Sequence, residues 1–187
     1  MENVTLLRSR RRSIGLELKT DGTLVVRAPY RMPEADIRRF LAEKETWIVS
    51  RRKKLDARRK AASQAGILTA SELGALRQQA KETLPQYTAH FAAMLGAEYR
   101  KVVIRTQRSR WGSCSSRGTI SLNCLLMLTP PGVQEYVAAH ETCHLLEMNH
   151  SVRFYALLSR VLPDWKSREA WLRENGQTLM LRLPDAE

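Results

Sequence analysis

The sequence predicts an α+β fold in two parts. Near the front, apolar residues alternate on both sides of Asp21-Gly22, which is the pattern of a β-hairpin closed by a tight turn. Farther on, apolar residues at helical spacing are followed by two short β-rich runs. A chain of 187 residues, 43% of them hydrophobic, suits a main domain with a small appendage. We expect the appendage over residues 1–65 and the main domain over residues 66–187.

The front part is predicted to be a hairpin followed by a basic helix. Its two strands are expected at residues 14–18 and 24–26. Pro29 and Pro33 interrupt the alternation, and apolar residues at helical spacing then predict a helix from about residue 34 to about residue 59.

Positive charge is concentrated in this front part. The chain carries 31 Lys and Arg against 19 acidic residues, a net charge of +12. The second half of the predicted helix contributes Arg51, Arg52, Lys53, Lys54, Arg58, Arg59 and Lys60. Such a surface could bind nucleic acid or another polyanion by releasing counterions. We favour a solvated helix face, because no aromatic residues interleave with these charges to stack on bases.

The main domain is expected to begin with a long helix and two strands. Residues 61–69 lose charge and include Gly66, which indicates a connection. Apolar residues three and four apart then predict a helix over residues 73–95, capped by Gly96, which Pro85 either kinks or divides. Strands are predicted to follow at residues 101–105 and 119–123.

The segment between these strands reads Arg-Trp-Gly-Ser-Cys over residues 110–114, which is unusual for a plain connector. A structural turn packed by Trp111 and a substrate-binding segment are both consistent with it. After the second strand, Pro130 and Pro131 predict a helix start with Thr129 as N-cap, about ten residues before His140.

The strongest functional signal is the run His-Glu-Thr-Cys-His at residues 140–144. On a helix, His140 and His144 would share one face about 6 Å apart along the axis, so both could bind one metal ion. Glu141 would lie beside that face and could hold the attacking water without binding the metal, as in His-Glu-x-x-His metallopeptidases. Ordinary histidines remain the alternative if the segment is not helical.

A third metal ligand requires the helix to end. A helix continued to His150 would carry it about 120° away from His144 and about 9 Å along the axis. Asn149 can terminate a helix, and Ser151 can cap a following one. A turn between them would return His150 toward the metal.

Carboxylates compete with His150 for this position. Glu147 lies three residues after His144 on the same helical face, and Glu169 and Glu174 on a later helix are weaker candidates. We favour His150 because imidazole is a good zinc ligand and the turn signals are placed where it needs them. Three neutral histidines would leave one coordination position open.

The chain is expected to end in two helices, from Ser151 to about Val161 and from Trp165 to Asn175, the second stopping at Gly176. Trp165, Trp171 and Leu172 are expected to pack these helices onto the core.

Two further features suggest a cytoplasmic protein. The three cysteines, Cys114, Cys124 and Cys143, form no CxxC pair, so neither a disulfide framework nor a cysteine zinc site is indicated. The first thirty residues lack an apolar signal segment, and no stretch approaches the roughly 18 apolar residues of a membrane span.

Several motifs together resemble the YgjP-like metallopeptidases, which are similar to the SprT-like proteases. They are Arg110-Trp111-Gly112-Ser113-Cys114, Ile120-Ser121-Leu122-Asn123, His140-Glu141-Thr142-Cys143-His144, and Asn149-His150-Ser151 with Phe154 downstream. The resemblance implies a zincin-like catalytic domain that cleaves peptides or proteins. It places His140, His144 and His150 on zinc and makes Glu141 the general base.

Departures from the family pattern are small. Thr142 stands where the family commonly has leucine, and Tyr155 where it commonly has tryptophan. The histidine spacing is also similar to that of metzincins, but Glu147 stands where those have glycine, which argues against that assignment.

The resemblance leaves the substrate contacts open. By analogy with zincins, the strand at residues 119–123 is expected to line the cleft and pair with an extended peptide. Candidate donors to the oxyanion are Arg110, Asn123 and Tyr155.

Two other functions fit the same residues. One is zinc-dependent hydrolysis of nucleotide phosphate anhydrides, with the basic front part holding an anionic substrate. The other is a nucleic-acid-binding protein whose metal is structural. Metal content, together with peptide and nucleotide hydrolysis by the wild type and by Glu141→Gln, would separate the three.

Overall fold

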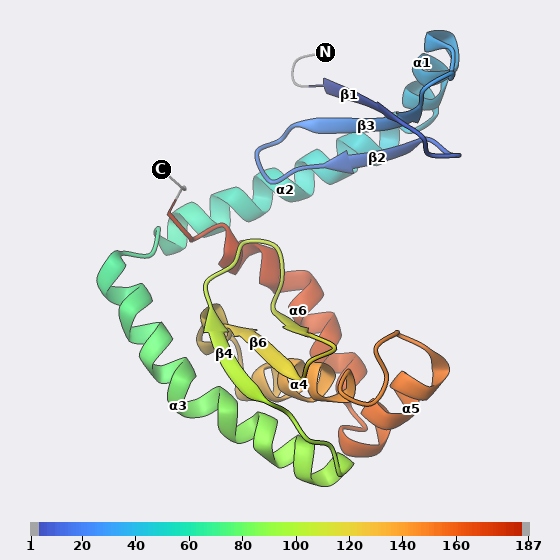
Figure 1. The fold of residues 1–187 in the computed structure, drawn as a ribbon. Coiled ribbons are helices and arrows are strands. Elements are labelled where there is room, and N and C mark those ends of the chain that lie inside the picture. The colour runs from blue at the N-terminus through green and yellow to red at the C-terminus, as the bar shows by residue number, and fades with distance from the viewer. Residues whose placement is uncertain (1–3, 185–187) are drawn as a thin grey trace. The chain divides into compact units, whose positions relative to one another are not determined.

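The computed structural model describes residues 4–184, and the chain divides into two compact units (Figure 1). The N-terminal unit is Met1–Gln64 and the C-terminal unit is Ala65–Glu187. The boundary expected from the sequence, after residue 65, lies one residue from this division.

The N-terminal unit contains a three-stranded sheet in the order β1-β3-β2. β2 (Gly15–Leu18) and β3 (Leu24–Pro29) form the predicted antiparallel hairpin, with Leu16 opposite Val26. β1 (Val4–Ser9) pairs in parallel with β3 and was not predicted. Its run of apolar residues does not alternate with polar ones, so it carries no period that marks a strand.

Two helices follow in this unit, where the sequence predicted one. α1 (Glu34–Glu43) ends at Lys44, whose N–H donates to carbonyls of the last turn, and α2 (Glu45–Ala65) begins immediately afterwards. α2 also runs past Arg59, where the prediction ended it. No helix-breaking residue occurs until Gly66, which has a φ of +79° and terminates the helix.

The C-terminal unit contains a second sheet, in the order β4-β6-β5. β4 (Lys101–Arg105) and β6 (Thr119–Asn123) match the predicted strands and pair in parallel. β5 (Gly112–Cys114) pairs antiparallel with β6 and was not predicted as a strand. β6 therefore has a neighbour on each side, so the expectation that it pairs with a substrate peptide is wrong. The edge strands are β4 and β5.

Helix α3 (Ala70–Leu95) begins with a capping box between Thr69 and Glu72. It ends at Gly96, which has the left-handed φ of +65° that favours glycine. Pro85 lies inside the helix without dividing it. α3 packs against β4, against the short 3-10 helix η1 (Cys124–Leu128) and against α4 (Pro131–Cys143), as Figure 1 shows.

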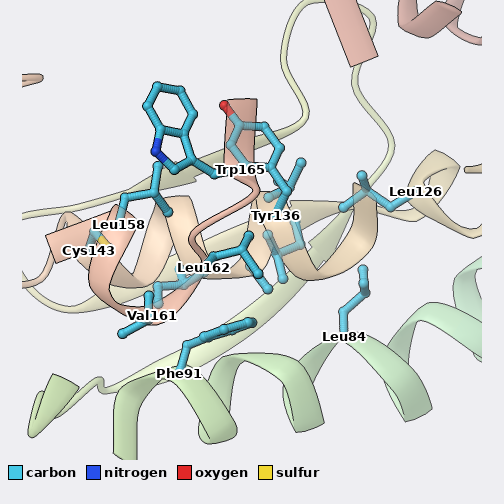
Figure 2. Packing of buried hydrophobic residues seen from close by; sticks show 14 of the residues in the cluster. Leu84, Phe91, Leu126, Tyr136, Cys143, Leu158, Val161, Leu162 and Trp165 are labelled. Atoms are coloured by element: carbon cyan, nitrogen blue, oxygen red, sulfur yellow. The ribbon is translucent and has the colours of Figure 1, made fainter. Parts of the chain in front are cut away.

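The core of this unit lies between α3 and the later helices α4, α5 (Val152–Val161) and α6 (Trp165–Met180). Figure 2 shows its packing, with these residues labelled: Leu84, Phe91, Leu126, Tyr136, Cys143, Leu158, Val161, Leu162 and Trp165. The predicted packing of Trp165 is confirmed, since it is 8% exposed.

Helix α6 does not end at Gly176, contrary to the prediction, but continues to Met180. Gly176 is buried, and a Cβ there would lie 3.0 Å from the indole of Trp111. The glycine therefore permits a close approach of α6 to Trp111 rather than capping the helix. This contact gives Trp111 the packing role that was one of its two interpretations.

The described part of the chain contains no disulfide, and all three cysteines are free thiols. Among residues 4–184, no helix is both long and apolar enough to cross a bilayer.

Candidate metal centre

Helix α4 carries the first half of the His-Glu-x-x-His motif. It begins at Pro131 with Pro130 in the N-cap position, so the prediction of Thr129 as N-cap is wrong. The Thr129 hydroxyl instead donates to the carbonyl of Leu126, closing the preceding 3-10 turn. Proline at the start of α4 costs nothing, because the first N–H groups of a helix have no partner within it.

The helix ends before His150, as the third ligand requires. α4 stops at Cys143, with His144 as its C-cap, so Asn149 is not the terminating residue. The chain then makes a tight turn in which the N–H of Ser151 donates to the carbonyl of Asn149 at 2.7 Å, and His150 lies at its tip. The Ser151 hydroxyl caps α5 as predicted, accepting from the N–H of Phe154.

This turn brings the three predicted histidines together. One ring nitrogen from each of His140, His144 and His150 lies within 4.8 Å of the other two. The Nε2 atoms of His140 and His150 are 2.9 Å apart. In the described residues no carboxylate joins this group, and Glu147, Glu169 and Glu174 lie outside it.

Glu147 contributes its backbone rather than its side chain. Its carbonyl oxygen lies 3.0 Å from Nδ1 of His144. Because a carbonyl only accepts hydrogen bonds, Nδ1 carries the proton and Nε2 keeps its lone pair. The hydrogen bond thus fixes the tautomer of His144 that can bind a metal through Nε2.

The ring of Phe154 forms an apolar floor beneath the three histidines. It is fully buried, and its centroid lies 4.9, 4.6 and 4.8 Å from the rings of His140, His144 and His150. A single side chain on α5 therefore holds all three imidazoles in place and keeps water from their underside.

The site favours neutral imidazoles. Burial, together with the neighbouring His144 and His150, lowers the pKa of His140 to about 4. Burial also lowers the pKa of His144. At neutral pH these rings are unprotonated, which is the state in which histidine binds a metal.

Glu141 lies beside the histidines and is only 7% exposed. Burial raises its pKa to about 8, and the positive charge of Arg110 opposes part of this rise. The carboxyl lies against the backbone of β5, where a Cβ built on Gly112 would stand 2.6 Å from both Cγ and Oε1 of Glu141. Gly112 is therefore required for Glu141 to occupy this place.

We expect Gly112→Ala to reduce hydrolysis by up to about 100-fold with little loss of thermal stability, because the added methyl displaces the Glu141 side chain. The checks are kcat/KM and the unfolding midpoint. Gly74→Ala on α3 is the matched control, since a Cβ there meets nothing within 4 Å. Activity of Gly112→Ala within twofold of the wild type would contradict the requirement for glycine.

An open pocket surrounds this group. Its lining residues are Gly112, Ser113, Cys114, His140, Glu141, His144, Met148 and His150. All three residues of β5 thus line the pocket, which places at the site a segment whose role the sequence left undecided. The pKa of the Cys114 thiol is raised to about 11 by burial and by the nearby Glu141, so Cys114 stays protonated and is no nucleophile at neutral pH.

The three candidate oxyanion donors differ in whether their side-chain N–H or O–H groups are already used in hydrogen bonds. Asn123 is buried, its amide nitrogen donates to the carbonyls of Gln107 and Arg110, and its oxygen accepts from the N–H of Leu125. With its hydrogen bonds used, it positions the 107–110 loop and is not an oxyanion donor. Arg110 is exposed, and the ring of Tyr155 lies 6.3 Å from that of His150.

The metal-free protein, prepared with a chelator, should lose stability as pH rises from 7 to 8. In this window His140 and His144 are mostly neutral in both states, whereas Glu141 is ionised when unfolded and at least half protonated when folded. The unfolded state then binds fewer protons, so stability falls by at most about 1.5 kcal/mol. Urea unfolding at the two pH values measures this loss, and Glu141→Gln should abolish it.

Below pH 6.5 the histidines reverse the sign of the pH dependence of stability. Their lowered pKa values mean that the unfolded state binds more protons, so their contribution to stability is lost as pH falls toward 4. A metal-free stability that rises between pH 7 and 8 would contradict the burial of a protonated Glu141.

Two solved structures resemble part of this fold. The metallopeptidase zymogen abylysin of Pyrococcus abyssi is 22% identical, with a TM-score of 0.46, and the match covers 51% of this chain and 97% of that one. The metallopeptidase zymogen jannalysin of Methanocaldococcus jannaschii is 17% identical, with a TM-score of 0.44, and the match covers 49% and 94%. No curated protein matches this chain.

A family model gives the assignment. The model of the YgjP-like metallopeptidase domain matches residues 12–73 and 68–175, which together include most of the N-terminal unit and the metal centre. The chain therefore belongs to the YgjP-like family and is a metallopeptidase.

Proposed function

We propose that this metallopeptidase uses zinc, held by His140, His144 and His150, and that Glu141 is its general base. The observation that carries the proposal is the convergence of three imidazole nitrogens within 4.8 Å beside a buried carboxyl group.

The donor set fits zinc. Among the described residues, three imidazoles and no carboxylate form a nitrogen site of the kind found in catalytic zinc enzymes, which keep a fourth position open. The tautomer fixed at His144 by the Glu147 carbonyl suits binding through Nε2. When bound there, zinc would act as a Lewis acid on the scissile carbonyl and the attacking water.

Glu141 moves the proton. Its carboxylate takes the proton of the attacking water and passes it to the leaving nitrogen. Burial raises the pKa of this carboxyl group, which makes the ionised group a stronger base than an exposed glutamate. The close contact with Gly112 keeps the carboxyl at the cleft wall through both transfers.

The substrate peptide binds along β5. This strand lies at the edge of the sheet and at the wall of the metal pocket. An extended peptide can add to such an edge through main-chain hydrogen bonds, which recognise any sequence. Recognition of particular side chains must then come from surfaces next to β5.

Metal analysis and hydrolysis assays test the proposal. The purified protein should contain about one zinc per chain, cleave peptides, and lose that activity with chelator and regain it with zinc. Nucleotide triphosphates assayed in parallel test the phosphate anhydride alternative. Absence of bound metal would exclude both enzymes, and cleavage of nucleotides alone would replace the peptidase proposal.

Binding of nucleic acid by α2 is a separate proposal for the N-terminal unit. Most of its basic residues are exposed, and Arg51 lies over the ring of Trp47 at 5.5 Å. A duplex held by several of these charges would show an affinity that falls steeply with salt. A shallow salt dependence would leave α2 as the solvated face that its composition favours.

A further inference from the structure

A second pocket opens beside the metal site. Its lining residues are Glu98, Tyr99, Arg100, Ser115, Ser116, Arg117, Gly118, His144, Leu145 and Met148. His144 and Met148 also line the metal pocket, so the two pockets adjoin at these residues. A substrate bound over the metal site therefore reaches the second pocket within a few residues.

Two arginines come together in this pocket from separate segments. Arg100 directly precedes β4, and Arg117 lies in the turn between β5 and β6. The N–H of Arg100 donates to the carbonyl of Gly118 at 2.8 Å. Gly118 has a φ of +72°, and a Cβ there would lie 3.2 Å from the same nitrogen. The glycine therefore lets the turn lie directly against the residue that begins β4.

The turn that carries Arg117 is also closed by its own hydrogen bonds. The N–H of Ser115 donates to the carbonyl of Thr119 at 3.0 Å, and the N–H of Gly118 donates to the carbonyl of Ser115 at 2.9 Å. The hydroxyl of Ser115 accepts from the N–H of Thr119 at 3.1 Å and keeps its own proton free to donate. The backbone that carries both arginines is thus held in place by hydrogen bonds.

The charges of this pocket are not balanced from within. Glu98 is its one acidic lining residue, against Arg100 and Arg117. Within residues 4–184, neither arginine makes an ion pair. Guanidinium groups bind carboxylates through paired hydrogen bonds, so this surface is complementary to an acidic side chain.

We propose that this pocket is a specificity subsite for an acidic side chain of the substrate, Asp or Glu, bound by Arg100 and Arg117. The inference rests on the proposed peptidase function. A peptide on β5 passes from the metal site toward the 115–118 turn, because β5 ends at that turn. Antiparallel pairing, the commoner kind, directs the peptide so that residues N-terminal to the scissile bond reach the pocket.

The test is the cleavage profile of the zinc-loaded enzyme on a mixture of natural peptides. Acidic residues should be enriched at one position within three residues on the N-terminal side of the cleaved bond. For a good substrate, replacing that Glu with Gln should lower kcat/KM about tenfold. The double variant Arg100→Ala/Arg117→Ala should cleave both peptides equally, and Arg117→Glu should favour a Lys at that position.

Arg105→Ala is the matched control, because this exposed arginine lies at the other end of β4 and should keep the preference. A wild-type profile without acidic enrichment, or with enrichment only on the C-terminal side, would overturn the subsite while leaving the peptidase function intact. If the double variant kept the wild-type ratio of kcat/KM between the Glu and the Gln peptide, that result would also overturn the subsite. Failure to cleave any peptide would refute the peptidase function itself, and the subsite with it.

Discussion

Replacing Glu141 with Gln is expected to lower kcat/KM for peptides by about 10²–10⁴-fold, while the protein keeps its zinc. Glutamine has the same shape but cannot accept the proton of the attacking water. Because the Glu141 side chain lies outside the histidine group, metal content should not change. Peptide hydrolysis and metal analysis on the same preparation measure both outcomes.

Glu147→Gln is the matched control for this change. Glu147 lies in the same segment, but it contacts His144 through its backbone carbonyl, which the substitution leaves in place. Activity and zinc content close to wild type are therefore expected. Full activity in Glu141→Gln would exclude the general-base role, and loss of zinc in Glu147→Gln would restore Glu147 as a metal ligand.

Local signals predicted much of the fold. Signals that act within a few residues of chain can be recognised from the sequence alone. Examples are the spacing of His140 and His144, the cap at Ser151 and the glycine at residue 96. The end of the helix before His150 was predicted for a geometric reason, since a continuous helix would carry that histidine away. The residue at which α4 ends was not predicted, because histidine is not a residue type that commonly ends helices.

Contacts distant in sequence were harder to predict. β5 has three residues, too few to show a period of two, so nothing in the sequence marked it as a strand. Gly112 is needed because the Glu141 side chain lies against it, and Gly176 because the Trp111 ring does. Each partner is far away along the chain. A glycine that permits close approach looks the same in sequence as one that ends a helix, which is why α6 was predicted too short.

The histidine site depends on neighbours that do not themselves bind metal. Phe154 contacts all three imidazole rings from below, and the Glu147 carbonyl fixes the tautomer of His144. Both act through position rather than through reactive chemistry, so residue type alone could not reveal them. They explain how an exposed residue such as His150 can be held in place for a shared ion.

His150→Ala is expected to weaken zinc binding by more than about 100-fold, beyond the 10- to 100-fold that loss of a supporting contact typically costs. Two nitrogen ligands would remain where the site needs three. Competition with a chromogenic chelator measures the affinity, and hydrolysis at limiting zinc should fall with it. The metal-free variant should unfold near the wild-type midpoint, since the His150 side chain is exposed and fills no core.

The fourth histidine of the chain supplies the control. His90 is exposed on α3, where its ring contacts Phe91 at 5.1 Å, and it lies outside the metal group. His90→Ala should bind zinc and cleave peptides as the wild type does. Equal zinc affinity in the two variants would exclude His150 as a ligand. The tight turn from Asn149 to Ser151 would then serve only to connect α4 with α5.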